Sequence, residues 1–315
     1  MNEILAKIEA APIICVFRHQ APDPDALGSQ WGLVNWLKET YPNKEVYAMG
    51  WHRGQSAALF GNYETVSDDV VRKSLAIILD TANAARIDDD RYQYAYDSIK
   101  LDHHPFTDAY AMYEFIDDTA ASTSELVCRL IQSKSRETLS PTTARYLYMG
   151  ILTDTLRFST SNTSASTLHC AAFLVNSDLN LSQINDDLFG MERIEFELTN
   201  YIRTHAIIED SGLVYIKLDR STMERLRVTP GLAKERVNEL GLVRSFQIWA
   251  LLIEQEEDGL IRYNGSLRSR RLSVNDIAQR YNGGGHRLAA AVKHLTDDQV
   301  DLCLEDCRKR IRGEI

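Results

Sequence analysis

Acids and imidazoles follow the ends of several apolar segments in this sequence. The candidates are His19, Asp23, Asp25, Asp80, Asp102, His103, His104 and Asp154. In an open parallel sheet the carboxyl ends of the strands converge on one crevice, so residues that are distant in sequence meet there. The sequence therefore predicts a centre at which carboxylates and imidazoles bind metal ions.

The types of ligand atom indicate which metal would bind. Imidazole combined with several carboxylates, and without thiolate, favours a borderline-hard divalent ion such as Mn²⁺, with Mg²⁺, Fe²⁺ and Co²⁺ as alternatives. Four of the carboxylates, with a total charge of −4, match two divalent cations. A single ion would leave buried negative charge unbalanced, at a cost of several kcal/mol. Two ions about 3.5–4 Å apart can activate a water for an in-line displacement at phosphorus, so we expect phosphoester hydrolysis.

Each candidate also has a structural interpretation. Asp25 would cap the helix that follows it, Asp80 would complete a strand-end turn, and His104 would occupy a helix C-terminal position. A cap needs only one acid, so capping explains neither His19 nor the second acid at Asp23. Because all the candidates would fall at strand ends together, we favour the metal centre.

A second group of residues, near the C-terminal end of the chain, is typical of phosphate binding. It comprises Arg268, Arg270, Gly283, Gly284, Gly285 and His286. Consecutive glycines permit positive φ and offer backbone N–H groups to an anion. Residues 260–290 contain six Arg against one Asp, in a chain whose net charge is −10. We expect one arginine to make a bidentate phosphate contact, and Arg268 is our choice.

Length and composition limit the class of protein. With 315 residues, 44% hydrophobic and 25% charged, the chain has the composition of an ordinary soluble protein, long enough for two domains. A protein that grips long nucleic acid usually presents a broad basic face, whereas here the positive charge is one local cluster. We therefore expect a small polyanion as partner and no long nucleic acid.

The sequence also suggests where the protein works. No apolar run approaches the roughly 18 residues of a membrane span, and the N-terminus lacks a basic region followed by an apolar stretch. Five cysteines without a C-x-x-C pair indicate reduced thiols rather than disulfides, and Cys303 and Cys307 are expected in a core. We expect a cytoplasmic protein without membrane partners, and dimerisation is a further expectation.

The candidates are positioned by an alternating pattern of strands and helices. Strands are predicted at 12–17, 44–49, 74–80, 95–101 and 111–116. Helices are predicted to begin near Ala26, after Ser122 and after Ser140, where capping residues precede apolar positions at helical spacing. This alternation predicts an α/β domain with a parallel sheet over residues 1–185.

The pattern changes in the remainder of the chain. Residues 186–206 are predicted to form a helical linker, and residues 207–315 a smaller α+β domain that binds substrate. Its predicted strands cover 205–210, 213–218, 245–254 and 260–267, with an acidic turn at 256–259. Its predicted helices cover 231–240, 274–281 and 296–312. The reaction is expected in a cleft between the two domains.

At these residues the chain resembles the DHH phosphoesterase family, named for the motif seen here as Asp102-His103-His104. Five ordered motifs carry the resemblance: 19–29, 79–82, 102–104, 150–158 and 283–286. The resemblance implies one ion bound by His19, Asp23 and Asp80, and a second bound by Asp25, Asp80, His103 and Asp154. It also implies that Asp80 bridges the ions, that His104 faces the scissile phosphate, and that Asp102 orients an imidazole.

The residues within two of the motifs make the resemblance more specific. Asp-Pro-Asp at 23–25 and Asn282 before the glycines look most like the NrnA-type bacterial nanoRNases, which implies short RNA and 3′-phosphoadenosine 5′-phosphate (pAp) as substrates. Arg157 of the fourth motif is then a candidate catalytic residue. The chain departs from the pattern at Leu156, where Gly is common, and at Val292, where Gly is usual.

Two other functions are compatible with these residues. One is a phosphodiesterase for cyclic or linear dinucleotides (c-di-AMP, pApA, pGpG), or an exonuclease for longer single strands. The other is a nucleotide sensor that binds metal without turnover. A sensor need not retain a bridging carboxylate and a second ion, so we favour an enzyme.

Overall fold

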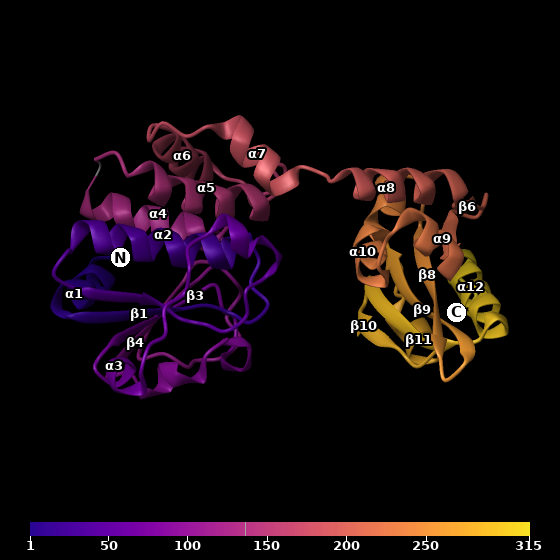
Figure 1. Ribbon diagram of the computed structural model, residues 1–315, viewed down its shortest axis with the longest axis horizontal. Helices are drawn as coiled ribbons and strands as arrows, with labels where there is room; N and C mark the ends of the chain where they lie inside the picture. Colours follow the sequence, from indigo (N-terminus) through magenta and orange to yellow (C-terminus); the bar gives the residue numbers. More distant parts are fainter. Residues whose placement is uncertain (136) are drawn as a thin grey trace. The chain divides into compact units, whose positions relative to one another are not determined.

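The computed structural model describes residues 1–135 and 137–315, and of Gln55 only the main chain. The chain forms two compact units, Met1–Gly190 and Met191–Ile315 (Figure 1). The first unit contains a parallel sheet and the second a mixed sheet, so the α/β architecture predicted from the sequence is confirmed.

The sheet of the first unit has five parallel strands in the order β2-β1-β3-β4-β5. The strands are β1 (Ile13–Phe17), β2 (Glu45–Ala48), β3 (Leu75–Leu79), β4 (Asp97–Asp102) and β5 (Tyr113–Ile116). In the centre of the sheet Ile14 lies opposite both Val46 and Leu75. All five strands expected in this region are present.

Seven α-helices accompany this sheet in the described residues. They are α1 (Asn2–Ala10), α2 (Pro24–Thr40), α3 (Asp68–Arg72), α4 (Thr123–Lys134), α5 (Pro141–Asp154), α6 (Ala165–Val175) and α7 (Leu181–Phe189). Three short 3₁₀ helices, η1 (Gln55–Leu59), η2 (Ala84–Arg86) and η3 (Asp90–Tyr94), lie in the connections. Ser122 and Ser140 accept hydrogen bonds from Glu125 N and Thr143 N, so both predicted caps form.

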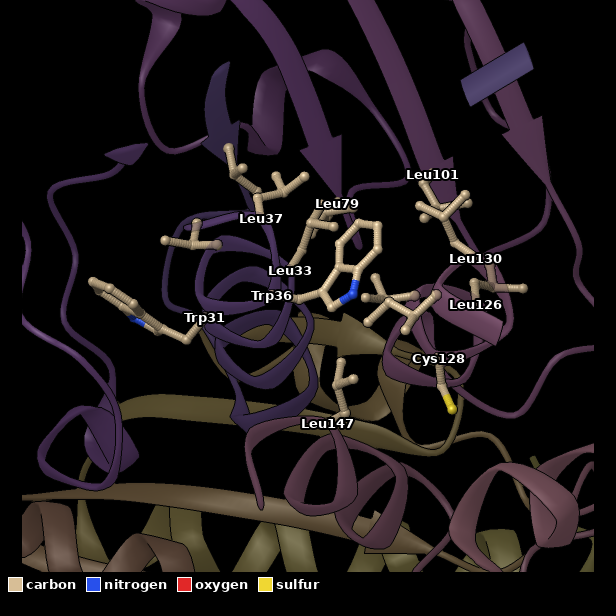
Figure 2. Packing of buried hydrophobic residues seen from close by; sticks show 14 of the residues in the cluster. Trp31, Leu33, Trp36, Leu37, Leu79, Leu101, Leu126, Cys128, Leu130 and Leu147 are labelled. Atoms are coloured by element: carbon tan, nitrogen blue, oxygen red, sulfur yellow. The ribbon is translucent and has the colours of Figure 1, made fainter. Parts of the chain in front are cut away.

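Alternate residues of the buried strands pack on opposite faces of this sheet, because successive strand side chains point to opposite sides. Ile14 and Val16 face α1, α2, α4 and α5, whereas Cys15 and Phe17 face α3 and the loops beyond β2 and β3. In Figure 1 helices α2, α4 and α5 lie along one side of the strands. Figure 2 shows Trp36 between Leu79 and the leucines of α4, in the larger of these two cores.

The sheet of the second unit has six strands in the order β10-β11-β9-β8-β7-β6, antiparallel except between β7 and β8. The strands are β6 (Ile207–Ile208), β7 (Leu213–Leu218), β8 (Ile248–Glu257), β9 (Leu260–Ser269), β10 (Gly284–His286) and β11 (Ala289–Leu295). Asp258 and Gly259 make the β8–β9 turn with φ of 52° and 76°, shorter than the predicted acidic turn.

Helices cover both faces of this second sheet. They are α8 (Arg193–His205), α9 (Arg220–Leu226), α10 (Pro230–Glu235), the 3₁₀ helix η4 (Arg236–Leu242), α11 (Asn275–Gln279) and α12 (Asp297–Arg312). Helices α11 and α12 pack on one face, and α8, α9, α10 and η4 on the other. Cys303 and Cys307 are buried in the core beneath α12, as expected, and all five cysteines are free and buried.

The segment predicted as a helical linker, residues 186–206, differs from the expectation. It contains the end of α7, a break at Gly190–Glu192, and α8. Leu198 and Ile202 of α8 are fully buried against the second sheet. Helix α8 therefore belongs to the core of the second unit rather than forming an exposed bridge.

Two further segments differ from the sequence prediction. One was predicted as a single helix and the other as a glycine loop. Residues 231–240 form two short helices, α10 and η4, because the chain changes to 3₁₀ geometry at Arg236. Gly284–His286 forms the edge strand β10 rather than an open loop. Within the described part of the chain, no helix combines the length and apolarity needed to cross a membrane.

Candidate metal centre

Strand ends and helix ends of the first unit deliver the candidate ligands. His19 follows β1, Asp80 directly follows β3, and Asp102 ends β4, so these side chains emerge at the carboxyl edge of the sheet. Asp154 is the last residue of α5. The first turn of α2 supplies Asp25, and its N-cap Asp23 accepts hydrogen bonds from two backbone N–H groups at 3.1 and 3.0 Å.

The structure brings these side chains into three overlapping groups. The ligand atoms of each group lie within 4.8 Å of one another, and the groups are His19–Asp23–Asp80, Asp25–His103–Asp154 and Asp80–His103–His104. All six residues expected to bind metal occur in these groups, together with His104. Clusters of carboxylate and imidazole with no thiolate suit a borderline-hard divalent cation.

Asp80 lies between the groups and uses its two oxygens differently. Its Oδ2 is 3.4 Å from His19 Nε2, whereas its Oδ1 is 3.5 Å from His103 Nε2. Asp80 is 2% exposed and has a φ of 52°, a left-handed conformation that Asp adopts more readily than most residues. The carboxylate therefore faces both sets of ligands at once.

The imidazoles are held so that one nitrogen points at the carboxylates. The carbonyl of Gln20 lies 2.8 Å from His19 Nδ1, and because a carbonyl only accepts, Nδ1 carries the proton. Nε2 of His19 then points at the carboxylates, 3.4 Å from Asp80 and 3.7 Å from Asp23. His103 repeats the arrangement: its Nδ1 faces the carbonyl of Ala120 at 3.4 Å, and its Nε2 is 3.4 Å from Asp154.

The N-terminus of α4 forms part of the same site. The carboxylate of Asp25 accepts hydrogen bonds from Thr123 N at 2.8 Å and Ser124 N at 2.9 Å, the first two N–H groups of the helix. Thr123 Oγ1 donates to Asp80 Oδ1 at 3.1 Å. These N–H groups lack partners within the helix, and the helix dipole favours a negative charge there.

Negative charge accumulates in this site beyond what its imidazoles neutralise. Burial and the nearby charges of Asp25, Asp80 and Asp23 raise the pKa of Asp154 to about 10. Burial, followed by the charge of Asp80, raises the pKa of Asp25 to about 7. Burial alone would lower the pKa of His19, but its hydrogen bonds to Asp23 and Asp80 raise it to about 10. Bound divalent cations would neutralise this excess negative charge, so the set of ligand atoms fits them.

His104 and Asp102 form a pair beside the ligand groups. Asp102 Oδ1 accepts from the backbone N of His104 at 3.2 Å and from its Nδ1 at 2.8 Å. The hydrogen bond to Asp102 is the main cause that raises the pKa of His104. The other oxygen of Asp102 lies 3.8 Å from Nζ of the fully buried Lys100. Asp102 therefore fixes the orientation of the His104 ring.

Sequence reasoning did not identify Thr123, Ser124 or Lys100. The backbone N–H groups of Thr123 and Ser124 carry no residue-specific signal, although the serine and threonine run before α4 marked a helix start there. Lys100 was detectable as a charge inside the apolar run Ile99–Leu101, because a fully buried Lys needs partners. Its Nζ donates to the carbonyl of Ala82 at 2.9 Å.

The ring contact of Arg157 is with a residue outside the ligand groups. Its guanidinium stacks over the ring of Phe189 at 4.6 Å from the centroid. Leu156 and Arg157 follow α5 with φ of 45° and 61°, so the position where the family pattern has Gly is a left-handed one. Leu156 is 64% exposed, so its side chain points away from the protein interior.

In the second unit, Arg268 and His286 occupy one row of the sheet. Ala289 lies opposite Arg268 on one side and opposite His286 on the other. Residues directly opposite in antiparallel strands point to the same face, so both side chains flank the small Ala289. Arg268 donates to the carbonyls of Leu267 and Ala290, and burial lowers its pKa. Among the described residues no carboxylate pairs with Arg268, which leaves its charge available to an anion.

The other predicted binding residues have structural tasks. Arg270 donates to the carbonyls of Gly241, Val243 and Phe246 at 2.8, 3.0 and 3.4 Å, so its donors are committed to the main chain. A Cβ on Gly283 would come within 1.8 Å of the Ala291 carbonyl oxygen, so this glycine permits close strand approach. At Gly284 the corresponding space is open.

Val292 and a small pocket lie next to the row formed by Arg268, Ala289 and His286. Val292, where the family pattern has Gly, is 1% exposed and fills the space beside Gly265 in the neighbouring strand. A pocket of about 230 Å³ extends from Ser266 and Ala291 toward Lys234 and Lys293. Ser266 is two residues from Arg268 on β9, so the pocket opens on the same face of the sheet.

Comparison with protein families assigns both units. The DHH family, N-terminal domain, matches residues 13–151, and the DHHA1 domain matches residues 213–313. The chain is 32% identical over 307 residues to the bifunctional oligoribonuclease and PAP phosphatase NrnA of Bacillus subtilis, covering 97% of this chain and 96% of that protein. It is 35% identical over 287 residues to a probable protein of the same name from Streptococcus mutans, covering 91% of each.

A solved structure supports the fold. The crystal structure of an exopolyphosphatase-related protein from Bacteroides fragilis superimposes with a TM-score of 0.79 and 22% sequence identity, covering 99% of this chain and 96% of that one. At this level of identity the similarity establishes the arrangement of the elements and leaves the substrate to the site itself.

Proposed function

Because this chain belongs to the DHH family, we propose that it is manganese-dependent and acts on short oligoribonucleotides and on the 3′-phosphate of pAp. Its relatives are named oligoribonuclease and phosphatase, so it is a hydrolase of phosphoester bonds. The observation that carries the proposal is the position of Asp80, whose two oxygens face separate groups of ligands. One bridging carboxylate with nitrogen and oxygen ligands on both sides is the arrangement that a pair of divalent ions requires.

We assign one cation to His19, Asp23 and Asp80, and the other to Asp25, Asp80, His103 and Asp154. Mn²⁺ is favoured because imidazole and carboxylate act together here, with Mg²⁺, Fe²⁺ and Co²⁺ as alternatives. When bound, the cations supply an activated water and neutralise charge on the phosphate. The four carboxylates match their total charge, and the N-terminus of α4 stabilises Asp25 as an anion.

His104 is the residue that we propose to face the scissile phosphate. Asp102 binds its Nδ1 at 2.8 Å, so Nε2 is the nitrogen free for the substrate. The hydrogen bond that His104 Nδ1 donates to Asp102 favours the protonated imidazole, which suits a donor to a phosphate oxygen. Arg157, shortly after the proposed ligand Asp154, remains a proposed catalytic residue, and its guanidinium packs on the ring of Phe189.

The second unit is proposed to bind the nucleotide through Arg268, His286 and Gly284. Arg268 is a half-buried cation that contacts only carbonyl groups, and a phosphate would supply its missing counter-charge. Ala289 leaves room for an anion between Arg268 and His286. Gly284 offers main chain without a side chain in the way. Gly283 and Gly285 act instead by allowing β10 to approach β11.

Short substrates are favoured over long ones by charge. The net charge of −10 repels an extended polyanion, whereas six arginines are concentrated within residues 260–290 of the sequence. Both of the named relatives act, by name, on oligoribonucleotides and PAP. A cytoplasmic location and soluble nucleotide partners go with this proposal, because five free thiols suit a reducing compartment.

A panel of substrates at equal concentration with Mn²⁺ tests the proposal. The panel contains pAp, a 5′-labelled RNA trimer, linear and cyclic dinucleotides, and a long single-stranded RNA. We expect the trimer and pAp to be hydrolysed fastest. Faster turnover of c-di-AMP, pApA or pGpG would make the chain a dinucleotide phosphodiesterase, and faster turnover of the long RNA would make it a longer-strand exonuclease. Tight binding of nucleotide without any hydrolysis would indicate a sensor.

A further inference from the structure

The segment Trp51–Gly54, which follows β2, is attached to the main chain that carries the proposed ligands. The backbone N–H groups of Trp51 and His52 donate to the Asp88 carboxylate at 2.7 and 2.9 Å. Asp88 N donates to the carbonyl of Arg18 at 3.0 Å, and Arg18 directly precedes the ligand His19. The start of the segment is therefore fixed to the end of β1, one residue from the metal centre.

The end of the segment contacts a second ligand loop. Gly54, with a φ of 72°, packs so closely on Pro22 that a Cβ would lie 2.4 Å from the Pro22 carbonyl oxygen. Pro22 directly precedes Asp23, whose side chain is 54% exposed. Both ends of the segment 51–54 thus lie against residues that neighbour proposed ligands.

A buried ion pair holds this segment in place. Arg18 and Asp88 are both 0% exposed and form an ion pair, and Arg18 also donates to the carbonyl of His52 and to Tyr63 Oη. Burying two charges is costly unless their hydrogen bonds are satisfied. Three of those bonds go to the main chain of Trp51 and His52. The pair therefore fixes the conformation of the segment before any ligand arrives.

The ring presented by this segment is exposed, unlike the other indoles. All four tryptophans are in the described part of the chain: Trp31, Trp36 and Trp249 are 8%, 4% and 8% exposed, whereas Trp51 is 64% exposed. Figure 2 shows the first two inside the core of the first unit. Because a tryptophan ring is usually buried, an exposed one on main chain that is anchored next to proposed ligands suggests contact with a ligand.

Arginines lie over two rings of this region. The guanidinium of Arg91, which is paired with Asp89 and Asp68, lies over the Trp51 ring at 4.9 Å, and that of Arg53 lies over the Tyr63 ring at 4.8 Å. Aromatic rings interleaved with arginine are the surface that single-stranded nucleic acid recognises, because bases stack on the rings and the cations attract the phosphates. Stacking tolerates any base, as an enzyme for short RNA of mixed sequence requires.

We propose that Trp51, with Arg53 beside it, stacks a nucleobase of a short single-stranded substrate while a phosphate of that substrate lies at the metal centre. This assignment rests on the proposed function and adds a recognition site on the first unit. It makes Trp51 a specificity-determining residue for oligonucleotides that contributes equally to binding of the ground state and the transition state. Loss of the ring should then raise KM and leave kcat unchanged.

Tryptophan fluorescence tests the contact directly. A phosphorothioate RNA trimer, used to slow turnover, should quench the emission of wild-type protein, because the only exposed indole would stack on a base. The Trp51→Phe protein should lose this quenching. An abasic trimer of equal charge should quench little. Equal quenching in Trp51→Phe, or by the abasic trimer, would overturn the assignment.

Kinetics supply the second test. Trp51→Ala should raise KM for the RNA trimer roughly tenfold, the size of one base–aromatic stack, and Trp51→Phe should restore most of the affinity. Phe196→Ala, which removes a ring on α8 that is 58% exposed, is the matched control and should leave KM unchanged. An unchanged KM in Trp51→Ala would refute stacking. Failure of wild-type protein to hydrolyse trimer and pAp with Mn²⁺ would refute the proposed function instead.

Discussion

Asp80 differs from the other candidate ligands because its two oxygens face imidazoles of two different ligand groups. Replacing it with Asn removes one unit of charge and one good ligand atom while keeping the shape of the side chain. Asp80 is 2% exposed and lies between His19 and His103. The other residues of the two ligand groups therefore cannot move to replace the lost oxygen. The effect should therefore exceed that of substituting a ligand that serves one ion.

We expect Asp80→Asn to lower kcat for pAp and for the RNA trimer by roughly a thousandfold or more, because charge stabilisation by the ions contributes several kcal/mol. Elemental analysis after incubation with Mn²⁺ should show fewer bound ions per chain. Asp97→Asn is a matched control, since Asp97 starts β4 at the opposite edge of the same sheet and pairs with Lys7. Wild-type rates in Asp80→Asn would exclude the bridging role.

Arg268 and Arg270 lie two positions apart and both donate to main-chain carbonyls, two for Arg268 and three for Arg270, so they allow a paired prediction. Arg268→Ala should raise KM for pAp about 10- to 100-fold with a smaller loss of thermal stability than Arg270→Ala, because the charge of Arg268 lacks an acidic partner in the described residues. Arg270→Ala should lower the melting temperature and leave KM unchanged, because it releases three main-chain carbonyls. Metal content measured for both proteins should equal that of wild type, and a loss of metal in Arg268→Ala would contradict the assignment.

At the scale of the elements, the metal centre depends on how closely α5 approaches α4. Gly150 in α5 leaves space for the first turn of α4: a Cβ there would lie 2.0 Å from Ser124 Oγ and 2.7 Å from Asp25 Oδ1. The absence of a side chain thus permits the hydrogen bonds that Asp25 accepts from Thr123 and Ser124. Helix packing and ligand position are coupled at this residue.

Gly150→Ala should consequently lose both bound metal and more than tenfold in kcat, with stability reduced by about 1–3 kcal/mol through overpacking. Gly32→Ala is the matched control. It crowds α5 against α2, because a Cβ on Gly32 would meet Leu147 at 2.5 Å, yet it lies about two turns from the nearest proposed ligand of α2, Asp25. Chemical denaturation and metal analysis of both proteins separate the effects. Equal metal loss in the two variants would mean that general destabilisation is responsible.

The strands, and the strand-end acids and imidazoles that we propose as ligands, were predictable because buried parallel strands are continuous apolar runs and the polar residues that end them are easily recognised. Asp80 and His103 could be identified from one strand each without knowing which strands are neighbours. The contribution of Thr123 and Ser124 was not predictable, since it comes from main-chain groups whose position depends on the packing of α4. Gly284 was expected in a loop because a glycine run has no apolar pattern, and only pairing with β11 makes it a strand.

Helices with weak local signals were missed for a similar reason. Helix α6 has apolar residues on more than one side, including Leu168, which is 52% exposed, and helix α7 buries only Ile184, so neither was assigned from one clear apolar face. The polar surface of α8 predicted an exposed linker, whereas its buried Leu198 and Ile202 are too few to reveal that it belongs to the second core. Tertiary packing decides these elements more than intrinsic propensity does.

At the scale of the whole molecule, the two units have separate cores. None of the four buried clusters found among the described residues combines side chains from Met1–Gly190 with side chains from Met191–Ile315. Each unit also has its own sheet. All the proposed ligands belong to the first unit, so metal binding and folding should be linked in that unit alone.

Calorimetry of the intact protein should therefore show two unfolding transitions, of which Mn²⁺ shifts only one. An ion at 100 times its dissociation constant stabilises the folded state by about 2.7 kcal/mol, which for a unit of this size raises the melting temperature by roughly 5–10 °C. The shift should be large because cations also remove the mutual repulsion that raises the pKa of Asp154 and Asp25. Asp80→Asn should reduce the response, and the fluorescence of Trp249 in a Trp31→Phe, Trp36→Phe, Trp51→Phe protein identifies the transition of the second unit. A single transition that moves as a whole with Mn²⁺ would show that the two cores unfold cooperatively.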